Sequence, residues 1–165
     1  MGKEKLNEVG DSREGKYLSF FLGEEEYGLG ILRVKEIIGM ISVTPLPKTP
    51  DFVKGVINLR GKVIPVVDLR LRFGMEPVQY TERTCIVVVE ITGSAGAIFI
   101  GIVVDSVSEV IHIKSSDIED PPDFGTTVHT EYILGMAKMA GNVRILLEIN
   151  KVLNADEFSD LDQVA

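Results

Sequence analysis

Residues 55–68 read Gly-Val-Ile-Asn-Leu-Arg-Gly-Lys-Val-Ile-Pro-Val-Val-Asp, and this stretch decides the fold. Two apolar, β-branched runs flank Arg60-Gly61, which is the sequence pattern of a β-hairpin with a tight turn. Gly61 can adopt the positive φ that such a turn requires. Arg60 then lies at the tip, where its charged side chain reaches solvent or a partner. Pro65 has no N–H group and predicts an edge strand or a bulge at that position.

A second stretch, residues 135–149, repeats this pattern. It reads GMAKMAGNVRILLEI and aligns Gly141 with Gly61 and Ala140 with Arg60. If one hairpin is used twice, the fold does not require an arginine at the turn. Arg60 is therefore a candidate for contact with another molecule, against the simpler interpretation of a solvated tip.

Two further blocks recur in the same order. Residues 28–38, with the pattern G-x-x-I-x-x-V-x-E-I-I, align with residues 101–111, and residues 50–52 align with residues 122–124. Three matches in one order indicate two copies of one small β unit. Short strands joined by Gly and Pro turns favour a mainly β fold, with two small barrels packed side by side over a shared apolar seam.

The repeats also divide the chain. Residues 1–15 are polar and without periodicity, which is typical of a flexible tail. The doubled β unit spans residues 16–154, with approximate halves at 16–75 and 82–154 between which strands can cross over. Residues 155–165 predict a short acidic helix or tail.

The composition disfavours several classes of function. A net charge of −8 argues against nucleic-acid binding, because phosphate contacts need a basic surface. No apolar run approaches the roughly 20 residues that span a bilayer, and the N-terminus lacks a signal-peptide core. The single Cys85 cannot form an internal disulfide, so a reducing, cytoplasmic setting fits.

The sequence lacks the common catalytic and metal-binding motifs. It has no nucleophile elbow, no phosphate-binding glycine loop and no paired-histidine motif, so no metal or cofactor is expected. Asp68 and Asp105 are the candidates for an acid–base pair of a small hydrolase. Each ends an apolar strand, however, where an Asp commonly caps a turn. A non-catalytic binding module is therefore the favoured class.

Several of these blocks resemble the bacterial chemotaxis coupling protein, the CheW family. The similar blocks are residues 27–28, 31, 34–37, 50–61, 64–70, 101–105 and 130–135. The resemblance covers nearly the whole chain outside the N-terminal tail. It implies two five-stranded, SH3-like β-barrel subdomains packed side by side, with short helices that include a C-terminal one. It also implies an adaptor without catalysis.

Members of this family link the cytoplasmic tips of methyl-accepting chemotaxis receptors to a histidine kinase. By this resemblance the receptor-binding residues are Val34, Glu36, Asn58, Arg60 and Gly61. A groove between the barrels is expected to accept apolar receptor residues. The kinase-binding residues implied are Phe124, Asp123, Val43 and Leu46. The kinase's regulatory domain has the same fold, so weak self-association in rings is a further implication.

One departure from the family pattern concerns the loop before Phe124. It is acidic in this chain, whereas some members carry a basic residue there. Two alternatives to a chemotaxis adaptor stay open at this point. One is a regulator that docks the same kinase in another pathway, and the other is the hydrolase that would use Asp68 and Asp105.

Overall fold

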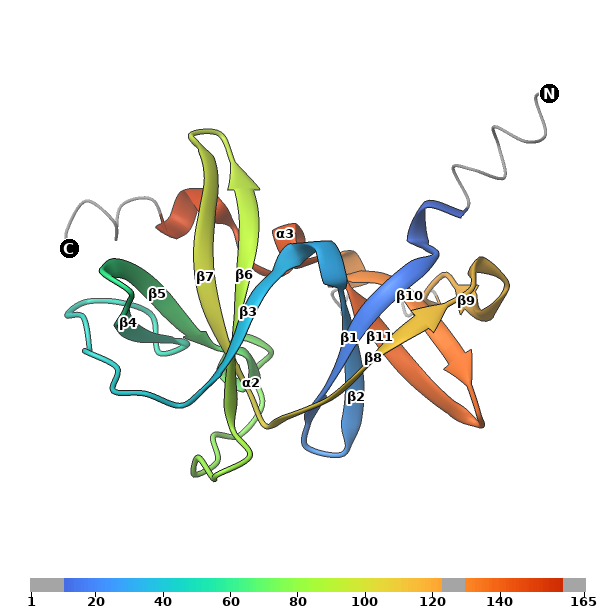
Figure 1. The fold of residues 1–165 in the computed structure, drawn as a ribbon, viewed down its shortest axis with the longest axis horizontal. Helices are drawn as coiled ribbons and strands as arrows, with labels where there is room; N and C mark the ends of the chain where they lie inside the picture. Colours follow the sequence, from blue (N-terminus) through green and yellow to red (C-terminus); the bar gives the residue numbers. More distant parts are fainter. Residues whose placement is uncertain (1–10, 123–129, 159–165) are drawn as a thin grey trace.

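The structure, a computed structural model, describes residues 11–122 and 130–158 (Figure 1). Its strands form two sheets, one ordered β8-β1-β2-β11-β10-β9 and the other β3-β6-β7-β5-β4. We call the first barrel A and the second barrel B. The strands of barrel A are β1 (Gly15–Leu22), β2 (Glu25–Gly30), β8 (Ser106–Ile113), β9 (Ile118–Glu119), β10 (Ile133–Met139) and β11 (Asn142–Leu147). Those of barrel B are β3 (Val34–Gly39), β4 (Val53–Leu59), β5 (Lys62–Asp68), β6 (Cys85–Gly93) and β7 (Gly96–Val104).

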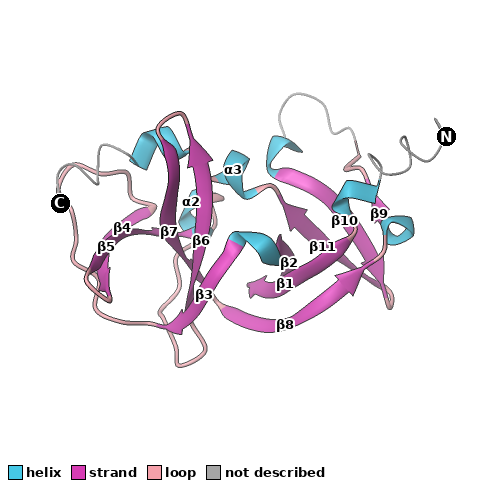
Figure 2. Cartoon of the chain, turned by 45° about the horizontal axis from the view of Figure 1, so that its top comes forward, coloured by secondary structure: helices cyan, strands magenta, loops and turns pink. Residues whose placement is uncertain are grey.

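The helices are single turns beside and between the two barrels (Figure 2). They are η1 (Asp11–Arg13), η2 (Ile31–Arg33), α2 (Leu69–Arg72), η3 (Ser115–Asp117), η4 (Thr130–Tyr132) and α3 (Ile149–Val152), with a further helical turn at residues 155–158. The predicted mainly β fold of two packed units is therefore confirmed. Barrel A differs from the expected five strands by the two-residue strand β9, which adds a sixth.

Each sheet curls so that the chain segment leaving the strand at one edge reaches the strand at the opposite edge. In barrel B the segment after β3 returns to β4, where Thr44 and Val56 exchange two backbone hydrogen bonds of 2.8 and 2.9 Å. Gly55 permits this approach, because a Cβ at that position would lie 2.0 Å from the carbonyl oxygen of Thr44. In barrel A the chain runs from β8 through η3 into β9, which pairs with β10.

The two predicted hairpins are present and share one turn geometry. Arg60 and Gly61 join β4 to β5 with φ values of 53° and 86°. Ala140 and Gly141 join β10 to β11 with φ values of 51° and 82°. Positive φ at both central residues is the two-residue turn that matches the twist of antiparallel strands. The repeat seen in the sequence is thus a repeat of structure, and its second copy forms without arginine.

Pro65 does not lie on an edge strand, contrary to expectation. Strand β5 lies between β4 and β7, and its register with β4 is continuous at Pro65. The irregularity in this hairpin lies between Val53 and Gly55 on the partner strand. Pro65 instead immediately precedes the first residue of β5 that pairs with β7, Val66. A residue without N–H is accommodated there because it has no ladder bond to make.

The repeats exchange hairpins. By the sequence alignment, β1 and β2 correspond to β6 and β7, yet β1 and β2 belong to barrel A and β6 and β7 to barrel B. Each barrel therefore completes its sheet with a hairpin from the other repeat. The parallel pairs occupy equivalent positions, since Val66 lies opposite Gly101 in barrel B and Leu146 lies opposite Gly28 in barrel A.

The largest hydrophobic cluster, which we call the seam cluster, lies between the barrels. Strand β6 shows how both faces of a strand are used: Val87 and Val89 belong to the seam cluster, whereas Val88 belongs to the interior of barrel B. Helix α3 lies where the barrels meet and contributes Ile149 and Val152 to the same cluster (Figure 1). The predicted shared apolar seam is therefore present. Because it is continuous, it fixes the two barrels to each other.

Candidate functional site

Arg60 and Glu36 form a bidentate ion pair on the surface of barrel B. Nη1 of Arg60 donates to Oε1 of Glu36 at 2.6 Å, and Nη2 donates to Oε2 at 2.5 Å. The side chain of Arg60 is 73% exposed and that of Glu36 is 26% exposed. Two parallel N–H···O bonds orient the guanidinium plane. The pair therefore presents a charged group in a fixed direction toward solvent.

Local backbone structure positions this pair. Strand β3 supplies Glu36, and the register of β3 with β6 shifts between Val34 and Glu36. The β4–β5 turn supplies Arg60, and the side-chain oxygen of Asn58 accepts a hydrogen bond of 2.8 Å from the N–H of Gly61. Asn58 thus shapes the turn that carries Arg60.

The ion pair changes the acidity of both partners. The hydrogen bond from Arg60 lowers the pKa of Glu36, and the bond to Glu36 raises the pKa of Arg60. Both shifts favour the charged forms of the two side chains. The charges of Arg60 and Glu36 already balance each other. A charged group on an approaching partner must therefore compete for one of these two side chains or add a further contact to the pair.

The five residues implied for receptor contact do not have equal exposure. Glu36, Asn58, Arg60 and Gly61 are gathered at the β4–β5 turn and the strand beside it. Val34 begins β3, is half-buried and packs against the seam cluster. Val34 therefore contributes to packing where the chain enters barrel B, and only part of its side chain is accessible to a partner.

Sequence reasoning missed a hollow beside the ion pair. It measures about 280 Å³ and is lined by Lys35, Glu36, Leu59, Arg60, Lys62, Ile64, Val88 and Phe99. The ammonium of Lys62 lies 4.7 Å from the centre of the Phe99 ring, a cation–π contact. Phe99 lies within the apolar run of β7, a sequence pattern that predicts a buried strand. The lysine directly after Gly61 was a signal in the sequence that could have drawn attention to this hollow.

The residues implied for kinase contact are only partly described. Val43 and Leu46 lie in the segment between β3 and β4, and both are half-buried. Thr44, between them, makes the pair of hydrogen bonds with Val56 that closes barrel B. Asp123 and Phe124 lie outside the described residues.

The two carboxylates considered for acid–base catalysis are held in separate structural contacts. Asp68 accepts from the N–H of Leu71 at 3.3 Å, as the cap of α2, and from the hydroxyl of Tyr80 at 2.7 Å. Asp105 accepts three hydrogen bonds from Arg70 and one from the N–H of Gly23. Neither carboxylate has the free oxygen and shared site that an acid–base pair requires, so the geometry does not support the hydrolase.

Other chemistry is sparse in the part of the chain that the structure describes. Among these residues no group of three or more His, Cys, Asp or Glu side chains could hold a metal ion. Cys85 is half-buried, with its sulfur 3.2 Å from the carbonyl oxygen of Arg83. No helix within residues 11–122 and 130–158 has the length and apolar character needed to cross a membrane.

The comparisons with known proteins decide the family. A model of the CheW-like domain matches residues 16–157. The chain belongs to the CheW-like family. The chemotaxis protein CheW of Klebsiella aerogenes is 41% identical over 157 residues, which cover 95% of this chain and 92% of that protein. The chemotaxis protein CheW of Rhizobium meliloti is 33% identical over 140 residues, which cover 85% of this chain and 88% of that one.

A solved structure agrees with the CheW-like assignment. It is that of the scaffolding protein TtCheW from Thermoanaerobacter tengcongensis, with a TM-score of 0.76 and 40% identity. The match covers 86% of this chain and 93% of that one. The resemblance found in the sequence is confirmed, and with it membership in a family of chemotaxis scaffold proteins.

Proposed function

We propose that the protein is a non-catalytic adaptor that couples methyl-accepting chemotaxis receptors to the chemotaxis histidine kinase. The observation that carries this proposal is the exposed Arg60, held by Glu36 at a turn whose repeated copy has Ala140. The fold uses the same turn twice, and only one copy carries a charged group. Folding does not require Arg60, and the Glu36 carboxylate holds its side chain toward solvent. Arg60 is therefore suited to contact with a partner protein.

The proposed receptor surface comprises Val34, Glu36, Asn58, Arg60 and Gly61. Apolar surface is available on the edge strands of both barrels, since Ile37 on β3 is 42% exposed and Val110 on β8 is 49% exposed. These two residues occupy equivalent positions in the repeats. They support the proposal that the apolar face of a receptor helix docks in a groove between the barrels.

The proposed kinase surface lies elsewhere, at Val43 and Leu46 on barrel B and at the segment with Asp123 and Phe124. The partner there is the regulatory domain of the kinase. The protein acts in the cytoplasm and is recruited to receptor arrays at the membrane, without inserting into the bilayer. It needs no cofactor, because its task is to hold two proteins together. Contacts between barrel ends would also allow weak self-association in rings.

We expect Arg60→Glu to fold normally and to lose receptor binding, because the change repels Glu36 and reverses the charge offered to the receptor. Ala140→Glu is the matched control, since it places the same residue at the same φ in the repeated turn. Co-sedimentation with receptor-containing membranes measures binding, and circular dichroism checks the fold. The adaptor should also raise the ATP-dependent autophosphorylation of the kinase in the presence of these membranes.

Normal receptor affinity of Arg60→Glu would remove Arg60 from the site. Equal loss of binding in Ala140→Glu would show that the effect comes from the turn and not from a receptor contact. Failure of the wild-type protein to raise kinase autophosphorylation, with both partners present, would contradict the adaptor itself.

A further inference from the structure

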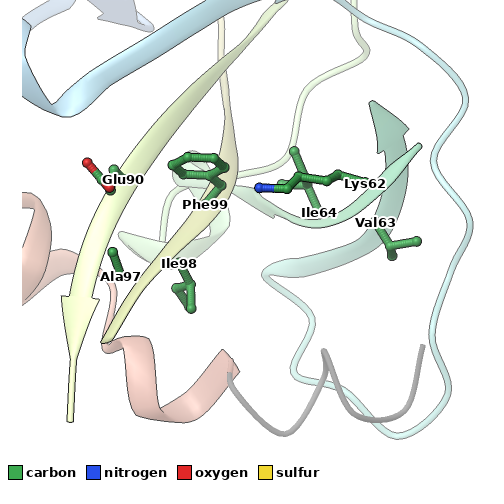
Figure 3. Close-up of a pocket in the computed structure, with 7 residues that line it drawn as sticks. All are labelled: Lys62, Val63, Ile64, Glu90, Ala97, Ile98 and Phe99. Carbon is green, nitrogen blue, oxygen red and sulfur yellow. The ribbon is translucent and has the colours of Figure 1, made fainter. Parts of the chain in front are cut away.

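Strands β5 and β7 of barrel B form an open fork. They pair in parallel only where Val66–Asp68 lies beside Gly101–Val103. Before that point they diverge around a hollow of about 450 Å³ (Figure 3). The hollow is lined by Lys62, Val63, Ile64, Glu90, Ala97, Ile98 and Phe99. We call it the β5–β7 fork.

Both strands of the fork have a free edge toward the hollow. Strand β5 pairs with β4 along its other edge, from Lys62 to Val67, and β7 pairs with β6 along its whole length. On the side that faces the hollow, residues 62–65 and 96–100 pair with no strand that the structure describes. Unpaired strand edges are templates for the addition of another strand.

Pro65 makes this fork deeper than its counterpart in barrel A. There the parallel pair of β11 and β2 begins one step earlier, with Ile145 opposite Tyr27. The equivalent pair in barrel B, Pro65 with Ile100, is missing because proline has no N–H to donate. The barrel A hollow is correspondingly smaller, at about 300 Å³.

The two hollows have opposite chemistry. That of barrel A is lined by Phe21, Glu24, Glu25, Glu26, Asn142 and Val143. By the repeat, three glutamates there replace Ala97, Ile98 and Phe99, and Asn142 replaces Lys62. In the β5–β7 fork Glu90 is paired with Lys35 at 3.1 Å, while Lys62 forms no ion pair with any described residue. The fork thus offers an unmatched cation beside an apolar wall, on a protein of net charge −8.

We propose that the β5–β7 fork binds an extended, acidic segment of a partner protein by strand addition. The backbone of that segment bonds to a free edge of the fork. One of its carboxylates meets Lys62, and an apolar side chain packs on Phe99. Charge decides the choice of fork, because the glutamates of barrel A repel the same segment. The fork adjoins the proposed receptor surface, because Lys62, Ile64 and Phe99 also line the hollow beside the Arg60–Glu36 pair. The peptide contact at Lys62 and Phe99 is nevertheless additional to the contacts proposed for the receptor and the kinase.

The test uses the full-length protein and a fluorescein-labelled peptide, Gly-Asp-Val-Asp-Leu-Gly, blocked at its C-terminus. Fluorescence anisotropy at low ionic strength should show saturable binding. Lys62→Glu should weaken it at least about tenfold, because the carboxylate then meets a like charge. Asn142→Glu, the equivalent change in barrel A, should leave it unchanged. Pro65→Ile should also weaken binding, since it allows one more pair to close the fork.

Two further measurements identify the mode of binding. A peptide with N-methylated backbone amides should bind much more weakly, because strand addition uses those N–H groups. Amide chemical shifts should change at Val63 and Phe99 and not in β2 or β11. Lys62→Gln serves as the milder variant if Lys62→Glu perturbs the fold.

Several results would overturn the proposal. They are the absence of saturable binding up to about 1 mM peptide, equal affinity of the lysine variants, equal affinity of the N-methylated peptide, or shift changes confined to barrel A. The adaptor assay uses receptor membranes and kinase without this peptide. A negative peptide result therefore leaves the proposed adaptor function standing.

Discussion

Asp105 joins the two barrels through a few polar atoms. It lies between β7 and β8, where the chain leaves barrel B for barrel A. Its carboxylate accepts from the guanidinium of Arg70 at 2.7–3.1 Å and from the N–H of Gly23, in the β1–β2 turn, at 2.6 Å. Arg70 also donates to the carbonyl oxygen of Glu76 at 3.0 Å. One acidic residue therefore ties a turn of barrel A to α2 of barrel B.

Asp105→Asn should destabilise the protein at neutral pH by roughly 1–2 kcal/mol, because it removes the charge that Arg70 faces in a partly buried site. Burial raises the pKa of Asp105, but the hydrogen bonds from Arg70 and Gly23 outweigh it and the net pKa is lowered. The stabilisation is therefore present above the ordinary value of 3.8 and is lost as the pH falls through the lower, folded-state value.

Urea denaturation at neutral pH and at about pH 3 measures both effects. The wild-type protein should lose more unfolding free energy on acidification than Asp105→Asn does. An equal loss in both proteins would show that other carboxylates account for the acid sensitivity.

The repeat drew attention to one candidate contact residue by a difference between its two copies. Arg60 was found because Ala140 stands at the equivalent turn. Lys62 and Phe99 were missed, although their partners Asn142 and Glu26 also differ. The reason is that Phe99 lies in a run of β-branched and apolar residues, where burial is the ordinary expectation. Only the divergence of β5 from β7 leaves the Phe99 ring accessible to Lys62.

Among the elements, the β4–β5 hairpin depends on Gly55 as well as on its turn. Gly55 has a φ of 139°, and the carbonyl oxygen of Thr44 occupies the space of a Cβ. The hydrogen bonds between Thr44 and Val56 on this strand close barrel B. The identity of this one residue therefore allows the sheet to become a barrel.

Gly55→Ala should destabilise the protein by about 2–4 kcal/mol, because it combines backbone strain with a clash that the backbone of Thr44 cannot avoid cheaply. Hydrogen exchange should become faster at the amides of Thr44 and Val56. Gly30→Ala is the matched control, since no atom lies within 4 Å of a Cβ there. Unchanged protection at Thr44 and Val56 would mean that the bridge does not depend on Gly55.

The hairpins could be predicted from sequence, but the strands they pair with could not. Turn residues and alternation are local signals, whereas pairing between β2 and β11 joins residues far apart in the chain. The short connections between consecutive strands explain why the two repeats exchange hairpins. Only Asp105 separates β7 from β8, and only η2 separates β2 from β3. Such short connections cannot carry the chain back across its own barrel, so each hairpin pairs with strands of the other repeat.

At the scale of the whole molecule, the seam cluster makes the barrels interdependent. Phe158, near the end of the described chain, is 2% exposed and belongs to this cluster together with residues of β1, β6 and α3. Ala155 is buried there as well. The C-terminal turn at residues 155–158 is therefore part of the core, while residues 159–165 lie outside the described residues.

Phe158→Ala should lower the free energy of unfolding by about 3–5 kcal/mol, the usual cost of a cavity left by a buried aromatic ring. Because the seam is shared, both barrels should still unfold in one transition at a lower temperature. Differential scanning calorimetry measures this shift. Val110→Ala, at a side chain 49% exposed, should shift the transition little. Two separate transitions in Phe158→Ala would show that the barrels are independent.

The strand order also sets a sequence of events at the ribosome. Barrel B is one uninterrupted segment, residues 34–104, and every strand it needs has been synthesised before β8. Barrel A must wait, because β2 has to pair with β11, the last strand synthesised. The first hairpin made is thus the last to be completed, because β1 and β2 wait until β8 and β11 have been synthesised. Folding of the nascent chain therefore begins with barrel B, in the middle of the sequence, and ends with barrel A, which contains the first and last strands of the described chain.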